Sequence, residues 1–226
     1  MKKPYLKKGG KVAGFTIWIV DGKYIRGNID KEFTNFGQHF RFRFIPENEF
    51  WIDKEHGDSN EEKYFIDHML AENKFMSAGM TWRKANAKAD MIEKRERNKS
   101  EALKTVDKKN CLEKIHKKLL KKYSNGIKVW IVNGMLVRDL YFTDFTEGGH
   151  DRVYSFVPEK EVWLDDDLSL NEMKFILLHE LHERSLMCRG WKYNKAHKDS
   201  SEIEYYCRHH PKELDKKLEI EIKRNK

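Results

Sequence analysis

Cysteine is scarce in this chain: three of its 226 residues are cysteines, and no two of them lie close together in the sequence. An odd number without close pairing is typical of reduced thiols in the cytoplasm rather than of a secreted protein held by disulfides. We therefore expect a cytoplasmic protein with free cysteines. The sequence also has no Cys-x-x-Cys pair, no phosphate-binding glycine loop and no nucleophile elbow.

Long apolar runs are absent as well. Charged residues make up 36% of the chain, and no stretch approaches the roughly 20 apolar residues of a membrane-spanning helix. The N-terminus begins Met-Lys-Lys-Pro-Tyr and lacks the apolar core of a secretory signal. We expect no membrane segment and no secretory signal.

Negative charge is outweighed by positive charge, which leaves a formal net charge of +8. Such an excess is typical of a solvated, lysine-rich surface. It also attracts nucleic acid, so a nucleic-acid partner stays open at this point.

The strongest positive signal is an internal duplication, in which residues 14–97 (repeat 1) and 126–210 (repeat 2) carry two copies of one unit. TIWIVDGKYIR in the first copy matches KVWIVNGMLVR in the second, and FTNFGQHFRFRFIPENEFWID matches FTEGGHDRVYSFVPEKEVWLD. The period of about 110 residues is too long for a solenoid and indicates a duplicated small domain.

Three further segments complete the chain. We interpret residues 1–13 as a basic N-terminal segment, 98–125 as a Lys-rich helical linker and 211–226 as a charged tail. Each repeat alone would bury only a modest core, so we expect the repeats to pair with each other about a pseudo-two-fold axis.

Each repeat opens with a β-hairpin signal and closes with two helices. Asp21-Gly22 and Asn133-Gly134 lie between β-rich runs and are typical of tight hairpin turns. Phe40, Phe42 and Phe44 alternate with basic residues, which predicts a strand with one basic face.

The helices have recognisable ends. Capping boxes are predicted at Ser59-Asn-Glu-Glu62 and Ser169-Leu-Asn-Glu172, and C-cap glycines at Gly79 and Gly190. The predicted fold class is α+β: a tandem duplication of a small antiparallel sheet plus a helical hairpin.

Polar residues on an apolar helix face mark a candidate site in repeat 2. On a helix of about 100° per residue, His179, His182 and Glu183 point into the apolar side. Burying three such groups is costly unless they are paired or bind a metal.

The second helix of repeat 2 supplies partners. His197, Ser201, Glu204 and Arg208 share one narrow strip at helical spacing. A tight helical hairpin would bring His197 or Glu204 opposite His179. We therefore predict His179, Glu183, His197 and Glu204 as ligands of a divalent metal, with zinc as the preferred ion.

The string Phe-Ile-Leu-Leu-His179-Glu180-Leu-His182-Glu183 resembles the active-site helix of zincin-type metallopeptidases, an apolar run followed by His-Glu-x-x-His. The resemblance covers about ten residues, and the second ligand position holds Glu183 instead of histidine. It implies that His179 is a ligand and that Glu180 is the general base of a hydrolase acting on a peptide or protein. His182 is then a second catalytic candidate, as a ligand or a transition-state donor.

Repeat 1 is an internal control for these assignments. It retains His68, Glu72, Glu93 and Arg97 at the positions of His179, Glu183, Glu204 and Arg208. It has Met69, Ala71 and Asn86 where repeat 2 has Glu180, His182 and His197. The shared residues are explained by a structural hydrogen-bond network, whereas the added ones carry any chemistry. His150, after Gly148-Gly149, is interpreted as an exposed loop residue that could alternatively reach the helical hairpin.

Three hypotheses follow. The first is a metal-dependent hydrolase with a single site in repeat 2. The second is a non-enzymatic, basic nucleic-acid-binding protein. The third is a pseudo-symmetric interaction protein in which the His, Glu and Arg residues form a purely structural network.

Overall fold

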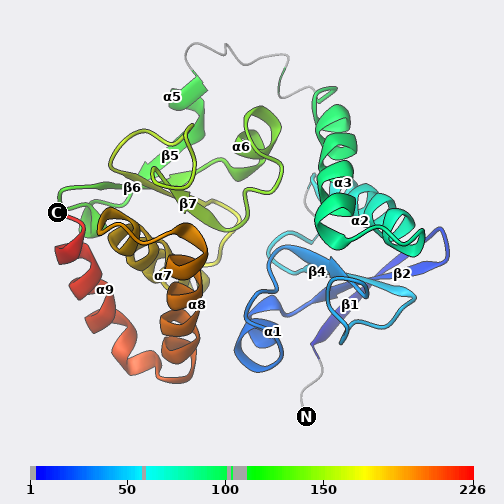
Figure 1. The fold of residues 1–226 in the computed structure, drawn as a ribbon, viewed down its shortest axis with the longest axis horizontal. Coiled ribbons are helices and arrows are strands. Elements are labelled where there is room, and N and C mark those ends of the chain that lie inside the picture. Colours follow the sequence, from blue (N-terminus) through cyan, green and yellow to red (C-terminus); the bar gives the residue numbers. More distant parts are fainter. Residues whose placement is uncertain (1–3, 58–59, 101–102, 104–110) are drawn as a thin grey trace. The chain divides into compact units, whose positions relative to one another are not determined.

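The computed structural model describes residues 4–57, 60–100, 103 and 111–226 (Figure 1). The chain forms two compact units. Unit 1 comprises Met1–Thr105 together with Arg138–Asp144, and unit 2 comprises Val106–Val137 together with Phe145–Lys226.

The two halves of the described chain share a series of four strands, a short helix and a helical hairpin, to which residues 111–226 add further helical segments. In chain order, residues 4–100 form β1 (Tyr5–Val12), β2 (Phe15–Val20), α1 (Gly22–Asn28), β3 (Phe36–Gln38), β4 (Glu49–Asp53), α2 (Glu62–Ser77) and α3 (Trp82–Arg97). Residues 111–226 form α5 (Cys111–Ile115), β5 (His116–Leu119), η1 (Lys121–Tyr123), β6 (Lys128–Val132), α6 (Gly134–Leu140), β7 (Gly148–His150), β8 (Glu161–Asp165), α7 (Leu170–Cys188), α8 (Tyr193–His209), η2 (Pro211–Glu213) and α9 (Leu214–Arg224). Of these, α5, η1, η2 and α9 are additional to the shared series.

Each unit is built on a four-stranded sheet, with strand orders β1-β2-β4-β3 and β5-β6-β8-β7. The predicted α+β class, two similar sheet units each followed by helices, is confirmed. The sheets are mixed rather than antiparallel, because β2 runs parallel to β4 and β6 runs parallel to β8. The parallel pair arises because the chain crosses over through a short helix, α1 or α6, between these strands.

The prediction of a hairpin turn at Asp21-Gly22 is wrong, because helix α1 begins there. Asp21 caps α1, accepting a hydrogen bond from the backbone N–H of Tyr24 over 3.3 Å. Gly22 lies directly against Asp53, whose carboxylate oxygen would be 1.8 Å from a Cβ at that position. The glycine is therefore required for close approach and not for a turn.

The hairpin of this sheet lies earlier in the chain. Strands β1 and β2 pair antiparallel around Ala13 and Gly14, whose φ angles are 47° and 91°. Most of the segment 1–13 is therefore part of the first sheet, and the folded repeat begins before residue 14.

The prediction of a strand at Phe40–Phe44 is also wrong. Strand β3 ends at Gln38, and the following residues form turns in which the Phe42 backbone donates to the Gln38 carbonyl over 2.9 Å. Arg41 stacks on Trp82 with 4.5 Å between the guanidinium carbon and the ring centroid, and Arg43 lies 5.6 Å from the centroid of Phe40. These arginines pack on aromatic rings instead of forming the predicted basic strand face.

The segments between and after the repeats also carry regular structure. In the predicted helical linker 98–125, α5 is followed by β5, which pairs antiparallel with β6. Residues 101–102 and 104–110 of that linker lie outside the described part of the chain. The charged tail forms α9, which packs against α7.

Sheet and helices share an apolar core in each unit. In unit 1, Ile17 and Ile19 of β2 join Phe65 and Met69 of α2 in one cluster, and Val20 faces a second cluster. This alternation places one face of the sheet under α2. In unit 2, Val162 and Leu164 of β8 pack with α7 in the corresponding cluster.

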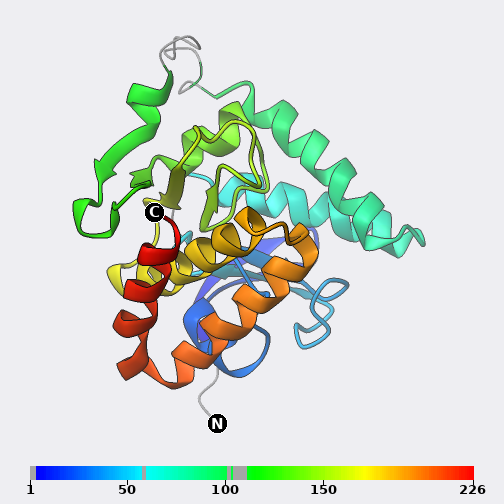
Figure 2. The same ribbon diagram turned by 60° about the vertical axis from the view of Figure 1, so that its left-hand side comes forward.

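The helical hairpins form as predicted. Figure 2 shows α7 and α8 lying side by side. Ser169 caps α7 by accepting from the Glu172 backbone over 3.4 Å, and Gly79 and Gly190 each end a first helix with a φ of 87°. Ser59, of the other predicted capping box, lies outside the described residues.

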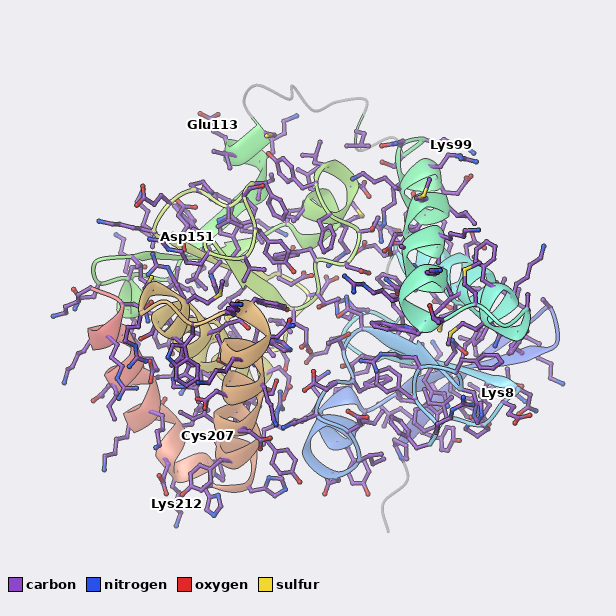
Figure 3. All side chains as sticks on the ribbon, viewed as in Figure 1. Lys8, Lys99, Glu113, Asp151, Cys207 and Lys212 are labelled. Atoms are coloured by element: carbon purple, nitrogen blue, oxygen red, sulfur yellow. The ribbon has the colours of Figure 1, made fainter. Side chains whose placement is uncertain are left out.

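The three cysteines are free, and Cys207 is buried. Figure 3 shows where it lies on α8. Among the described residues, no helix combines the length and the apolar character needed to cross a membrane.

Candidate functional site

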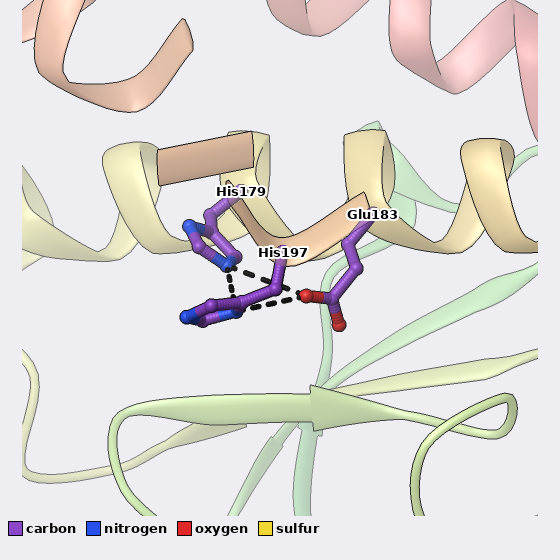
Figure 4. Close-up of side chains that lie close together, drawn as sticks. All are labelled: His179, Glu183 and His197. Atoms are coloured by element: carbon purple, nitrogen blue, oxygen red, sulfur yellow. Dashed lines mark hydrogen bonds and ion pairs between the residues drawn. The ribbon is translucent and has the colours of Figure 1, made fainter. Parts of the chain in front are cut away.

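The candidate site lies on the helical hairpin of unit 2. His179 and Glu183 are one turn apart on the same face of α7, and His197 projects toward them from the first half of α8 (Figure 4). His197 lies close because Gly190 ends α7 in the left-handed conformation and turns the chain back. Of the two residues expected opposite His179, namely His197 and Glu204, His197 lies on the side of the ring that faces Glu183.

Three ligand-type atoms converge here. His197 Nδ1 lies 2.9 Å from Glu183 Oε2 and 3.2 Å from His179 Nε2, and the latter two atoms are 3.8 Å apart. His179 and Glu183 are buried, whereas His197 is partly exposed. Two imidazoles and one carboxylate in this arrangement could hold a metal ion.

Glu204, predicted as a fourth ligand, lies behind His179 instead. It accepts a hydrogen bond from His179 Nδ1 over 2.9 Å, on the side of the ring away from Glu183. Its other oxygen accepts from Arg208 Nε over 2.8 Å, and Arg208 pairs in turn with Glu172. Glu204 therefore orients the imidazole and leaves Nε2 for the site.

Burial and ion pairing have opposite effects on the pKa values of His179, Glu183 and Glu204. Burial lowers the pKa of His179, but its hydrogen bonds with Glu183 and Glu204 outweigh burial and raise the pKa well above the usual range. Burial raises the pKa of Glu204, but His179 and Arg208 lower it to about 2. The Glu183 pKa is likewise far below normal because three histidines outweigh its burial. The site thus holds ionised carboxylates ready to balance positive charge.

Glu180, the predicted base, lies next to this triad. Ligand atoms of His150, Glu180 and Glu183 all lie within 4.8 Å of one another. Burial first, and then the nearby Glu183 carboxylate, raises the pKa of Glu180. A carboxylate with a raised pKa beside the triad is suited to accept a proton.

His150 belongs to the site, and its interpretation as an exposed loop residue is wrong. It ends β7, is completely buried and donates from Nε2 to Glu183 Oε1 over 3.1 Å. Gly148 permits this approach, because a Cβ there would come within 3.1 Å of Ile176 on α7. Gly148, two residues before the histidine, is the sequence signal for this close packing of strand and helix, whereas Gly149 lies against Tyr154 and Phe145.

His182, the second predicted catalytic residue, faces a different network. Its Nδ1 donates to Glu221 of α9 over 3.0 Å, and its Nε2 donates to Asp199 of α8 over 2.8 Å. Burial lowers the His182 pKa, but these two carboxylates outweigh it and raise the pKa. The structure therefore places His182 at the junction of three helices and not in the triad.

Repeat 1 reproduces the supporting network without the triad. His68 donates to Glu93 over 2.8 Å, and Arg97 donates to the same carboxylate over 2.7 Å. Gln38, at the position of His150, donates to Glu72 over 3.1 Å. Where unit 2 has Glu180 and His197, the first repeat has Met69 and Asn86.

A scan against protein-family models and searches of curated proteins and of solved structures find no match to this chain. Function is therefore inferred from the site itself.

Proposed function

We propose that the protein is a metal-dependent hydrolase with a single active centre in unit 2. The observation that supports it most is the convergence of His179 Nε2, His197 Nδ1 and Glu183 Oε2 on one point. Two of these three side chains are buried. Such groups are costly in a core unless they are paired or bind a metal. Here they are hydrogen-bonded around a point that three ligand atoms share, which an ion could also occupy.

The donor set fits zinc. Catalytic zinc sites use three protein ligands and leave the remaining position to water or substrate, and two histidines with one glutamate form one of the known sets. His179 would bind through Nε2 because Glu204 occupies its Nδ1. The ion would polarise a substrate carbonyl and lower the pKa of water.

Glu180 is the proposed general base. It follows His179 directly in the sequence and lies beside Glu183, at the edge of the triad. From there it accepts a proton as water attacks, and returns it to the leaving group. The substrate class proposed from the resemblance of the helix is a peptide or protein.

Metal content tests the proposal directly. The protein is purified without a histidine tag and its metal is measured by elemental analysis. We expect one ion per chain, lost in His179→Ala and His197→Ala and retained in the matched repeat-1 variant His68→Ala. Glu180→Gln keeps the ion but hydrolyses peptides about 10²–10⁴-fold more slowly.

A structural network is the second candidate, favoured by the His68–Glu93–Arg97 arrangement that repeat 1 shares. The structural network would be favoured if the wild-type protein contained no metal and if His68→Ala and His179→Ala lost folding to the same extent.

The free cysteines support a reducing compartment. We propose that the protein is cytoplasmic, where the thiols stay reduced. A cysteine found oxidised in protein isolated under alkylating conditions would contradict this.

A further inference from the structure

We propose that His150 is a positioning residue that confines Glu183 to one-oxygen coordination of the metal. This inference rests on the proposed metal centre. It assigns a function to a residue that is not one of the three ligands.

The hydrogen bonds of His150 define its role. Nε2 donates to Glu183 Oε1 over 3.1 Å, while Nδ1 accepts from the backbone N–H of Arg152 over 3.1 Å. A neutral imidazole has one donor and one acceptor nitrogen, so both are used in this arrangement. To bind a metal through Nε2, the neutral ring would have to carry its proton on Nδ1. That proton would then point at the backbone N–H of Arg152, which already donates to Nδ1.

Gln38 makes the same pair of hydrogen bonds in repeat 1. Its Nε2 donates to Glu72 over 3.1 Å, and its Oε1 accepts from the Phe40 backbone over 2.9 Å. Like His150, it is the third residue of a short edge strand. Glutamine cannot act as an imidazole ligand, yet Gln38 makes the same two hydrogen bonds as His150. We therefore interpret these bonds as holding the glutamate carboxylate in place.

The two oxygens of Glu183 then have separate functions. Oε1 is engaged by His150, and Oε2 faces His197 and His179. With one oxygen held, the carboxylate binds through the other alone. The centre keeps open positions for water and substrate, as catalytic zinc sites require.

The test compares His150→Gln with His150→Ala. Apo protein is titrated with Zn²⁺ to measure affinity, and with Co²⁺ to follow the absorption spectrum, which reports coordination number. We expect His150→Gln to bind Zn²⁺ within a few-fold of wild type with an unchanged Co²⁺ spectrum. His150→Ala should bind about 10–100-fold more weakly and show an altered spectrum.

Gln38→Ala is the matched control and should leave metal binding unchanged. Circular dichroism of each variant shows whether it is folded. If His150→Gln loses metal as completely as His150→Ala, His150 is a ligand and the inference is overturned. It is equally overturned if folded His150→Ala binds Zn²⁺ with wild-type affinity and spectrum. If wild-type protein binds no metal, the proposed function itself has failed.

Discussion

His179 donates a hydrogen bond to Glu204 over 2.9 Å and thereby joins α7 to α8 at the centre of the site. The raised pKa of His179 means that without a metal the ring carries a proton on both nitrogens. When the ring gives up one proton to bind a metal, the bond to Glu204 keeps the other on Nδ1, so that the lone pair of Nε2 is directed toward Glu183 and His197. Supporting carboxylates of this kind increase the basicity of a histidine ligand and hold its ring in place.

Replacing Glu204 with glutamine removes that charge while keeping the shape. We predict that Glu204→Gln weakens Zn²⁺ binding about 10–100-fold, because the His179 ring is held less firmly and is less basic. Equilibrium dialysis with elemental analysis measures the change. Glu93→Gln, the same substitution in repeat 1, should leave metal affinity unaltered while destabilising its own unit. Equal effects of the two variants on metal binding would show that Glu204 acts only through stability.

His182 should be important for stability and not for metal binding. His182→Gln removes two charge-assisted hydrogen bonds, to Glu221 and Asp199. We expect a loss of about 1–3 kcal/mol in the free energy of unfolding, measured by urea denaturation. Hydrogen exchange should rise in α9, and metal stoichiometry should stay at the wild-type value. If folded His182→Gln protein loses the ion, the prediction is wrong and His182 is part of the metal centre.

Local periodicity explains why part of the site could be predicted. A helix of 3.6 residues per turn places His179 and Glu183 on one face, and a C-cap glycine folds the next helix back, so His197 or Glu204 was expected opposite them. The tertiary partners were not local. His150 reaches Glu183 across a sheet edge and Glu221 reaches His182 from the tail, and no sequence period connects these pairs.

In the fold, too, local features could be predicted from the sequence and contacts distant in the chain could not. The start of α7 followed from its capping residue Ser169, and the ends of α2 and α7 followed from Gly79 and Gly190. The prediction of a hairpin at Asp21-Gly22 failed because a glycine needed for close approach to Asp53 resembles a turn glycine. The parallel pairing of β2 with β4 depends on contacts distant in the chain. The pattern within each strand does not encode its direction.

Repeat 1 should become a metal site when it gains one ligand. His68 is already oriented by Glu93, and Glu72 is held by Gln38. Glu72 Oε1 is buried and has no hydrogen-bond partner among the described residues. We predict that Asn86→His raises zinc stoichiometry from one ion per chain to two, as measured by elemental analysis. Asn86→Ala should stay at one, and adding Glu72→Gln to Asn86→His should abolish the second ion. A stoichiometry of one in folded Asn86→His protein would contradict the shared geometry.

The stability of unit 1 should fall as pH rises above neutrality. Burial lowers the pKa of His68, but the carboxylates of Glu93, Asp90 and Glu72 outweigh it and raise the pKa to about 9 from 6.5. The folded state therefore binds the proton more tightly than the unfolded state. This stabilisation is complete below pH 6.5 and is lost as pH rises through 9, a change of about 3 kcal/mol.

Asp90 acts in the same direction. Burial and the nearby Asp144 raise its pKa to about 8, so it also releases a proton from the folded state as pH increases. Hydrogen exchange of α2 and α3, measured in apo protein from pH 6 to 9 and corrected for intrinsic rates, should show falling protection. His68→Gln should flatten that slope without removing the part that Asp90 contributes. Constant wild-type protection across this range would contradict the raised pKa of both His68 and Asp90. Protection that falls equally in the wild type and in His68→Gln would mean that His68 is neutral in the folded protein, and that its contact with Glu93 is an ordinary hydrogen bond instead of an ion pair.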